Sequence, residues 1–149
     1  MNLRDKIAVI TGAASGIGKE TSIELAKRGC TPILVDINEA RLEEALVPVL
    51  NHASEATAEL CDISNDAAKI EQLVQKVNER YGRIDILINN AGIMIVKFFD
   101  EMSQDESARQ MAVNFYGGVN LISAVLPIMQ KQGKGVIINV ASVGGRLIV

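Results

Sequence analysis

The sequence predicts an α/β fold in which a parallel sheet is covered by helices on both faces. Strand-like runs alternate with helix-like segments along the chain, and this alternation is typical of βαβ units. The hydrophobic fraction is 48%, yet aromatic residues make up only 3% and tryptophan is absent. We therefore expect an aliphatic core, as in sheets that are buried on both faces. A chain of 149 residues is expected to form one domain, 1–149.

The first half of the chain contains three strand-like runs and two helix-like segments. The expected strands are Lys6–Thr11, Thr31–Asp36 and the weaker Ala56–Cys61. A helix from about Gly16 to Arg28 can end at Gly29, a usual C-terminal cap. A second helix can begin after Asn38, and Pro48 leaves its end open.

The second half contains two further strands and two further helices. The expected strands are Ile84–Ile88 and Gly135–Ala141. The first helix runs from about Asn65 to Arg80 and carries its apolar residues on one face. Ser103 and Glu106 match a capping box that opens a long helix toward Gln132, with Gly133 as a stop. Three residues predict that this long helix is irregular: Gly117, Gly118 and Pro127.

The alternation also predicts the topology of the sheet. Strands joined by helices use right-handed crossovers, and the doubly wound solution has strand order 3-2-1-4-5, ending here at the fifth strand. In such a sheet the ligand crevice lies beyond the carboxyl ends of the strands, where the order reverses between strands 1 and 4. Every motif described below falls at that edge.

A glycine-rich turn, Thr11 to Gly18, joins the first strand to the first helix. Glycines let the backbone approach a pyrophosphate closely, and the following helix offers free N–H groups to the phosphates. The alternative is a tight turn without a ligand. The position between a first strand and a first helix favours nucleotide binding.

Asp36 ends the second expected strand. A carboxylate at this place can accept hydrogen bonds from the ribose hydroxyls of an adenosine and would repel the 2′-phosphate of NADP. No Arg or Lys stands just before Gly16 or just after Asp36, although Lys19 is close. Asp36 therefore favours NAD, with NADP as the alternative, unless it is simply a polar residue at a strand end.

Taken together, the motifs resemble the classical short-chain dehydrogenase/reductase family over the whole chain. Thr11 to Gly18 is similar to its TGxxxGxG signature, and Asn89-Asn90-Ala91-Gly92 to its NNAG motif. Asp62 matches the aspartate that faces the adenine ring. Asn114 and Ser142 match the catalytic asparagine and serine.

The resemblance implies a three-layer Rossmann fold and an oxidoreductase. Hydride would pass between the nicotinamide of NAD and a small alcohol or carbonyl substrate, with Ser142 polarising the substrate oxygen and Asn114 holding a water in the proton relay. The implied cofactor-binding residues are Gly12, Ser15, Gly16, Ile17, Gly18, Asp36, Ile37, Asp62, Ile63, Asn90, Ala91 and Gly92. Plainer alternatives are a turn-stabilising role for Asn90, a satisfied buried amide for Asn114 and a turn residue for Ser142.

The sequence departs from the family at the catalytic Tyr and Lys. The family's YxxxK motif should follow Ser142 by a dozen or more residues, whereas the sequence ends at Val149. Neither Tyr81 nor Tyr116 is followed by Lys four positions later. We therefore expect part of a longer enzyme that is homo-oligomeric in its full-length form. The 149-residue chain is expected to be inactive, and the alternative is an NAD-binding module without catalysis.

Several other functions are not favoured. A net charge of -3 gives no basic face for nucleic acid or membrane lipid, no uninterrupted apolar run is long enough to span a membrane, and no leader is recognisable, so we expect a cytoplasmic protein. Cys30 and Cys61 should lie at opposite ends of the sheet as free thiols, His52 should be a surface residue, and no metal site is expected. An S-adenosylmethionine-dependent methyltransferase would not explain Asn89–Gly92 together with Asn114 and Ser142.

Overall fold

Five parallel strands form one sheet in the computed structural model, which describes residues 2–64 and 66–142. The strands are β1 (Ile7–Thr11), β2 (Thr31–Asp36), β3 (Thr57–Leu60), β4 (Ile86–Asn89) and β5 (Val136–Asn139). Their order is β3-β2-β1-β4-β5, and every pair is parallel. The doubly wound topology predicted from the sequence is confirmed.

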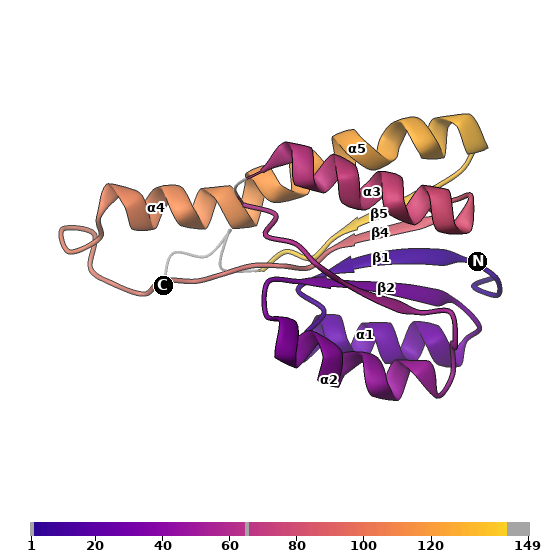
Figure 1. Ribbon diagram of the computed structural model, residues 1–149. Helices are drawn as coiled ribbons and strands as arrows, with labels where there is room; N and C mark the ends of the chain where they lie inside the picture. Colours follow the sequence, from indigo (N-terminus) through magenta and orange to yellow (C-terminus); the bar gives the residue numbers. More distant parts are fainter. Residues whose placement is uncertain (1, 65, 143–149) are drawn as a thin grey trace.

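Helices cover the sheet on both faces and complete three layers (Figure 1). Helices α1 (Gly16–Lys27) and α2 (Glu39–Leu50) lie on one face, and α3 (Ala67–Tyr81) and α5 (Gly117–Gln132) lie on the other. Helix α4 (Gln104–Met111) extends past the sheet on the side where the strands end. The carboxyl edge of the sheet therefore has a wall that the amino edge lacks.

Alternation along the strands divides the core into two clusters. Val9 and Val35 face one cluster with α3 and α5, whereas Ala8, Ile10 and Leu34 face the other with α1 and α2. All five are fully buried, because successive side chains of a strand point to opposite faces and both faces are covered. The expected aliphatic core is confirmed.

The predicted helix signals are borne out by the backbone. The Asn38 side chain accepts from the Arg41 N–H at 3.1 Å, and Ser103 with Glu106 forms both halves of a capping box. Gly29 and Gly133 follow their helices at φ +81° and +69°, in the left-handed conformation that favours glycine. Pro48 does not end α2, which continues to Leu50.

Element boundaries differ from the sequence expectation by at most two residues. Strand β4 begins at Ile86 and not at Ile84, because the Gln132 side chain donates to the Ile84 carbonyl at 2.9 Å and accepts from its N–H at 3.0 Å. Helix α3 begins at Ala67 after the cap Asp66, and the expected first residue, Asn65, lies outside the described residues. Strands β3 and β5 are also shorter than expected.

The expected long helix is continuous from Gln104 to Gln132, but its irregularity lies elsewhere than predicted. A π-helical segment, η1 (Ala112–Tyr116), separates α4 from α5 and contains Asn114.

The whole helix from Gln104 to Gln132 also has the length and apolar composition of a membrane span, with a mean hydropathy of 1.4 over 18 residues. The sequence reading missed it because small polar residues interrupt the apolar runs. In the fold, α5 packs on β4 and α3 through a buried stripe that includes Leu121 and Val125.

Candidate cofactor-binding cleft

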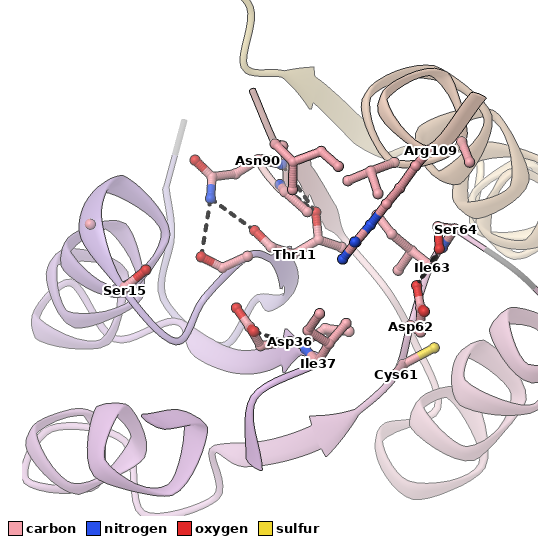
Figure 2. A pocket seen from close by; sticks show the side chains of 18 of the residues that line it. Thr11, Ser15, Asp36, Ile37, Cys61, Asp62, Ile63, Ser64, Asn90 and Arg109 are labelled. Atoms are coloured by element: carbon pink, nitrogen blue, oxygen red, sulfur yellow. Dashed lines mark hydrogen bonds between the residues drawn. The ribbon is translucent and has the colours of Figure 1, made fainter. Parts of the chain in front are cut away.

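A cleft of about 820 Å³ lies at the carboxyl edge of the sheet (Figure 2). Its walls are the turn after β1, the loops after β2, β3 and β4, and the inner side of α4 and η1. All the predicted cofactor-binding residues except Gly18 line it, namely Gly12, Ser15, Gly16, Ile17, Asp36, Ile37, Asp62, Ile63, Asn90, Ala91 and Gly92. The volume is in the range of small-molecule and cofactor sites.

The glycine-rich turn has a backbone that side chains would disturb. Gly12 and Gly16 have φ of +64° and +52°, and a Cβ on Gly12 would lie 2.8 Å from the Ala91 Cα. A Cβ on Gly18 would collide with the Gly12 carbonyl, so Gly18 lies beneath the turn and not in the cleft lining. A Cβ on Gly16 would meet nothing within 4 Å, so open space remains beside the start of α1.

Asn90 ties the loop after β4 to the turn after β1. Its side-chain amide donates to the carbonyls of Thr11 at 2.9 Å and Gly12 at 3.2 Å. In return, the Thr11 hydroxyl accepts from the N–H groups of Asn90 at 3.1 Å and Ala91 at 3.0 Å. The turn-stabilising role of Asn90 is therefore present, and the same residue lines the cleft.

Asp36 is held in one orientation by backbone N–H groups. Its Oδ2 accepts from Ala14 at 3.1 Å, and its Oδ1 accepts from Ile37 at 2.8 Å and from Asn38 at 3.0 Å. The carboxylate thus joins the end of β2 to the glycine-rich turn. Three N–H donors fix a negative charge at this side of the cleft.

Asp62 lies on the neighbouring loop and is exposed. Its Oδ1 accepts from the Ser64 hydroxyl at 2.6 Å and from the Ser64 N–H at 2.9 Å. These two bonds hold the pKa of Asp62 below its ordinary value, with smaller contributions from the charges of Arg109 and Lys69. Asp62 is therefore an anion over the whole physiological range.

The two expected catalytic residues lie outside the cleft lining. Asn114 is exposed on η1, and its amide pairs with the backbone of Ile93, accepting from the N–H at 2.8 Å and donating to the carbonyl at 2.9 Å. The amide is satisfied, as one alternative expected, but it is not buried. Ser142 is exposed after β5, at the end of the described residues. The described residues thus assemble the cofactor side of the expected site more completely than its catalytic side.

Several cleft residues were not singled out for it from the sequence, among them Cys61, Asp105 and Arg109. Cys61 was expected only as a free thiol at a strand end, and both cysteines are free and buried. Arg109 reaches the cleft from α4 (Figure 2), and no local motif marks it, since charged residues are common on exposed helices. His52 is exposed, and no described group of three or more His, Cys, Asp or Glu side chains could hold a metal ion.

These features together define a class of protein. A doubly wound parallel sheet, a glycine-rich turn at the point where the strand order reverses, and a carboxylate at the end of β2 constitute a Rossmann-fold domain. The model of the short chain dehydrogenase family matches residues 6–149, and the chain belongs to that family.

Known proteins of similar sequence and structure agree with this assignment. An uncharacterized oxidoreductase of Thermotoga maritima is 40% identical over 145 residues, which cover 97% of this chain and 57% of that protein. NAD⁺-bound xylitol dehydrogenase superposes with a TM-score of 0.93 at 31% identity, covering 98% of this chain and 56% of the other. A metagenomic short-chain oxidoreductase in complex with NADP superposes with a TM-score of 0.92 at 29% identity, covering 100% of this chain and 67% of the other. The chain thus spans little more than half the length of the first two proteins.

Proposed function

We propose that the chain is the cofactor-binding part of an NAD-dependent oxidoreductase that acts on a small alcohol or carbonyl compound. The observation that carries the proposal is the cleft, in which the glycine-rich turn, Asp36, Asp62 and Asn90 converge from four separate loops. Family membership supports an oxidoreductase. The similar structures with bound NAD⁺ and NADP support a nicotinamide dinucleotide as the cofactor.

The cleft suggests how such a dinucleotide would be held. The open space beside Gly16, at the start of α1, suits a pyrophosphate. The fixed carboxylate of Asp36 suits the adenosine ribose hydroxyls and opposes a 2′-phosphate, which favours NAD over NADP. Ile37, Asp62 and Ile63 would then border the adenine, while Ala91 and Gly92 would border the other half of the cofactor.

The proposed chemistry is hydride transfer, for which the bound nicotinamide would supply the acceptor or donor carbon. Ser142 would hydrogen-bond the substrate oxygen, and Asn114 would shape the site by holding Ile93, which also lines the cleft. The family's catalytic Tyr and Lys are not among these 149 residues. General acid–base catalysis contributes roughly 10²–10⁴-fold, so the proton-transfer step requires groups that this chain does not contain.

Calorimetric titration of the chain with NAD and NADP tests the binding part of the proposal. We expect NAD to bind and NADP to bind more weakly. Gly16→Ala should weaken NAD binding by at least about tenfold, because the added methyl group enters the proposed pyrophosphate space. Gly82→Ala is a matched control, since Gly82 also has a positive φ of +70° and open surroundings but lies outside the cleft. Undetectable NAD binding at millimolar concentration would contradict the proposal.

A second candidate function is nucleotide binding without catalysis, which the missing Tyr-x-x-x-Lys favours for the 149-residue chain. Incubation with NAD and a panel of secondary alcohols distinguishes the two functions. We expect no NADH absorbance from this chain, even where calorimetry shows NAD binding. Turnover by this chain would instead show that other residues supply the proton transfer.

A further inference from the structure

Arg109 is the least explained residue of the cleft. Among the described residues that line the cleft it is the only Lys or Arg, whereas three lining residues are aspartates, Asp36, Asp62 and Asp105. Its side chain extends from α4 across the cleft, toward the side where Asp62 and Ile63 lie (Figure 2). No hydrogen bond or ion pair holds its guanidinium to a described residue, so its position leaves it available to a ligand.

The position of Arg109 singles out one part of a dinucleotide. In the proposed binding mode the pyrophosphate lies at the glycine-rich turn and the ribose at Asp36. The adenine would therefore lie beyond Asp36, against Ile37 and Ile63. Ile37 is 61% exposed and lines the cleft, so this part of the cleft offers an apolar surface to the adenine, and Arg109 reaches the cleft from the α4 side opposite.

We propose that Arg109 is a further cofactor-binding residue, whose guanidinium stacks on the adenine ring and covers it from the α4 side of the cleft. A guanidinium is planar and weakly hydrated, and it stacks on nucleobases as well as on aromatic side chains. This inference rests on the proposed function, because it assigns a protein contact to one part of the dinucleotide.

Asp62 has a supporting role in this arrangement. Its carboxylate is anchored to Ser64, and the charge of Arg109 contributes to holding the pKa of Asp62 below its ordinary value. A fixed anion on the opposite side of the cleft attracts the guanidinium across the adenine position. Asp62 is thus a positioning residue for Arg109.

Three variants of Arg109 and its surroundings test the contact by calorimetry with NAD and with ADP-ribose, which lacks the nicotinamide. Arg109→Gln should weaken the binding of both ligands by roughly 5- to 30-fold, which is the effect of losing the stacking contact with one base. Arg109→Lys should lose most of the same affinity, because an ammonium keeps the charge but has no plane to stack. Lys69→Gln is the matched control: Lys69 also acts on Asp62 through its charge, is exposed, and lies outside the cleft lining.

Each outcome separates the inference from the proposed function. Unchanged affinity in Arg109→Gln, with NAD binding by the unsubstituted chain, would overturn only the Arg109 contact. Full affinity in Arg109→Lys, or an equal loss in Lys69→Gln, would show that charge alone acts, and would overturn stacking. Failure of the unsubstituted chain to bind either ligand would overturn the proposed function and this inference with it. Arg109 is exposed, and its side chain makes no hydrogen bond or ion pair with a described residue, so its variants should have the melting temperature of the unsubstituted chain.

Discussion

The two edges of the sheet use the same residue type for different purposes. At the amino edge, Asp85 is 5% exposed and binds Lys6 and the Ile7 N–H at the start of β1 as well as the nearby Arg83. At the carboxyl edge, Asp62 is exposed and bonded to Ser64 within its own loop, while Asp36 fixes backbone N–H groups around the cleft. The comparison indicates that bonding partners, more than the presence of a carboxylate, separate structural residues from candidate binding residues.

The amino edge is closed by the Asp85 cluster, which we define as Asp85, Lys6, Arg83 and the Ile7 N–H. The Asp85 Oδ1 lies 3.1 Å from the Lys6 Nζ, the Oδ2 accepts from the Ile7 N–H at 3.1 Å, and Arg83 binds both oxygens. Burial opposes the charge of Asp85, but Arg83, the Ile7 N–H and Lys6 outweigh it and hold its pKa below the ordinary value. The cluster joins the start of β1 to the segment before β4.

The largest expected effect comes from breaking this cluster. Asp85→Ala should lower the free energy of unfolding by about 3 kcal/mol, because it leaves two cations and a buried N–H without their shared acceptor. The comparison requires that NAD affinity of the folded protein stay within about twofold, because the cluster lies at the opposite edge. Urea unfolding and calorimetry measure the two quantities.

Asp62→Ala is the matched experiment at the carboxyl edge. It should change the free energy of unfolding by about 0.5 kcal/mol or less, as is usual for exposed sites, while weakening NAD. A stability loss as large as that of Asp85→Ala would remove the distinction between the two edges.

Asp36→Ala is expected to have the next largest effect, and this effect is on the binding of NAD. Loss of a charged acceptor for the ribose hydroxyls should weaken the binding of NAD by roughly 10- to 100-fold. Removal of the negative charge should strengthen the binding of NADP. Its three backbone donors gain access to water in the open cleft, so the free energy of unfolding should fall by only about 1 kcal/mol. If the ratio of NAD to NADP affinity did not change, Asp36 would not be the residue that selects between them.

Cys30 provides a pH-dependent test of the amino edge. It is 1% exposed, and burial, with the charge of Asp85, raises the pKa of its thiol to about 12. In the unfolded chain the thiol ionises near pH 8.5 to 9, so its stabilising contribution is complete below that pH and is lost as pH rises. The expected loss is about 1.4 kcal/mol per pH unit from about pH 9 to 12. Comparing Cys30→Ala with the parent chain by urea unfolding at pH 8 and pH 10 isolates this term, and parallel pH profiles would contradict it.

The sequence predicted the framework well because its signals are local or periodic. Alternating apolar residues, the Asn38 cap and the Ser103 capping box each specify a short stretch of chain, and their succession determines the strand order. The boundary of β4 was less predictable, because the side chain of Gln132, which is remote in sequence, hydrogen-bonds both the N–H and the carbonyl of Ile84.

The candidate site divides in the same way. The glycine-rich turn and Asp36 were found because backbone demands and spacing mark them, and Asn90 was found through its resemblance to the family's NNAG motif. Arg109 was missed, because its place in the cleft depends on where α4 lies relative to three loops. The π-helical segment at Asn114 was also missed, since the pairing of its amide with the backbone of Ile93 is a tertiary contact that no local pattern marks.

The two cysteines give the smallest expected effect and the most direct comparison of the edges. Cys61 lines the cleft at 6% exposure, whereas Cys30 lies outside the cleft lining at 1%. Burial raises the pKa of both thiols, so alkylation by iodoacetamide should be slow at neutral pH, and slower for Cys30.

If bound NAD blocks access to Cys61, NAD at three times its Kd should slow Cys61 labelling about fourfold, since only the free protein reacts. Cys30 should be labelled through a local opening of the amino edge that leaves the cleft and its NAD in place, so NAD should leave the rate of Cys30 labelling unchanged. Mass spectrometry of peptides labelled over time measures both rates in one sample. Equal protection of the two thiols would mean that NAD acts by global stabilisation and does not occupy the cleft beside Cys61.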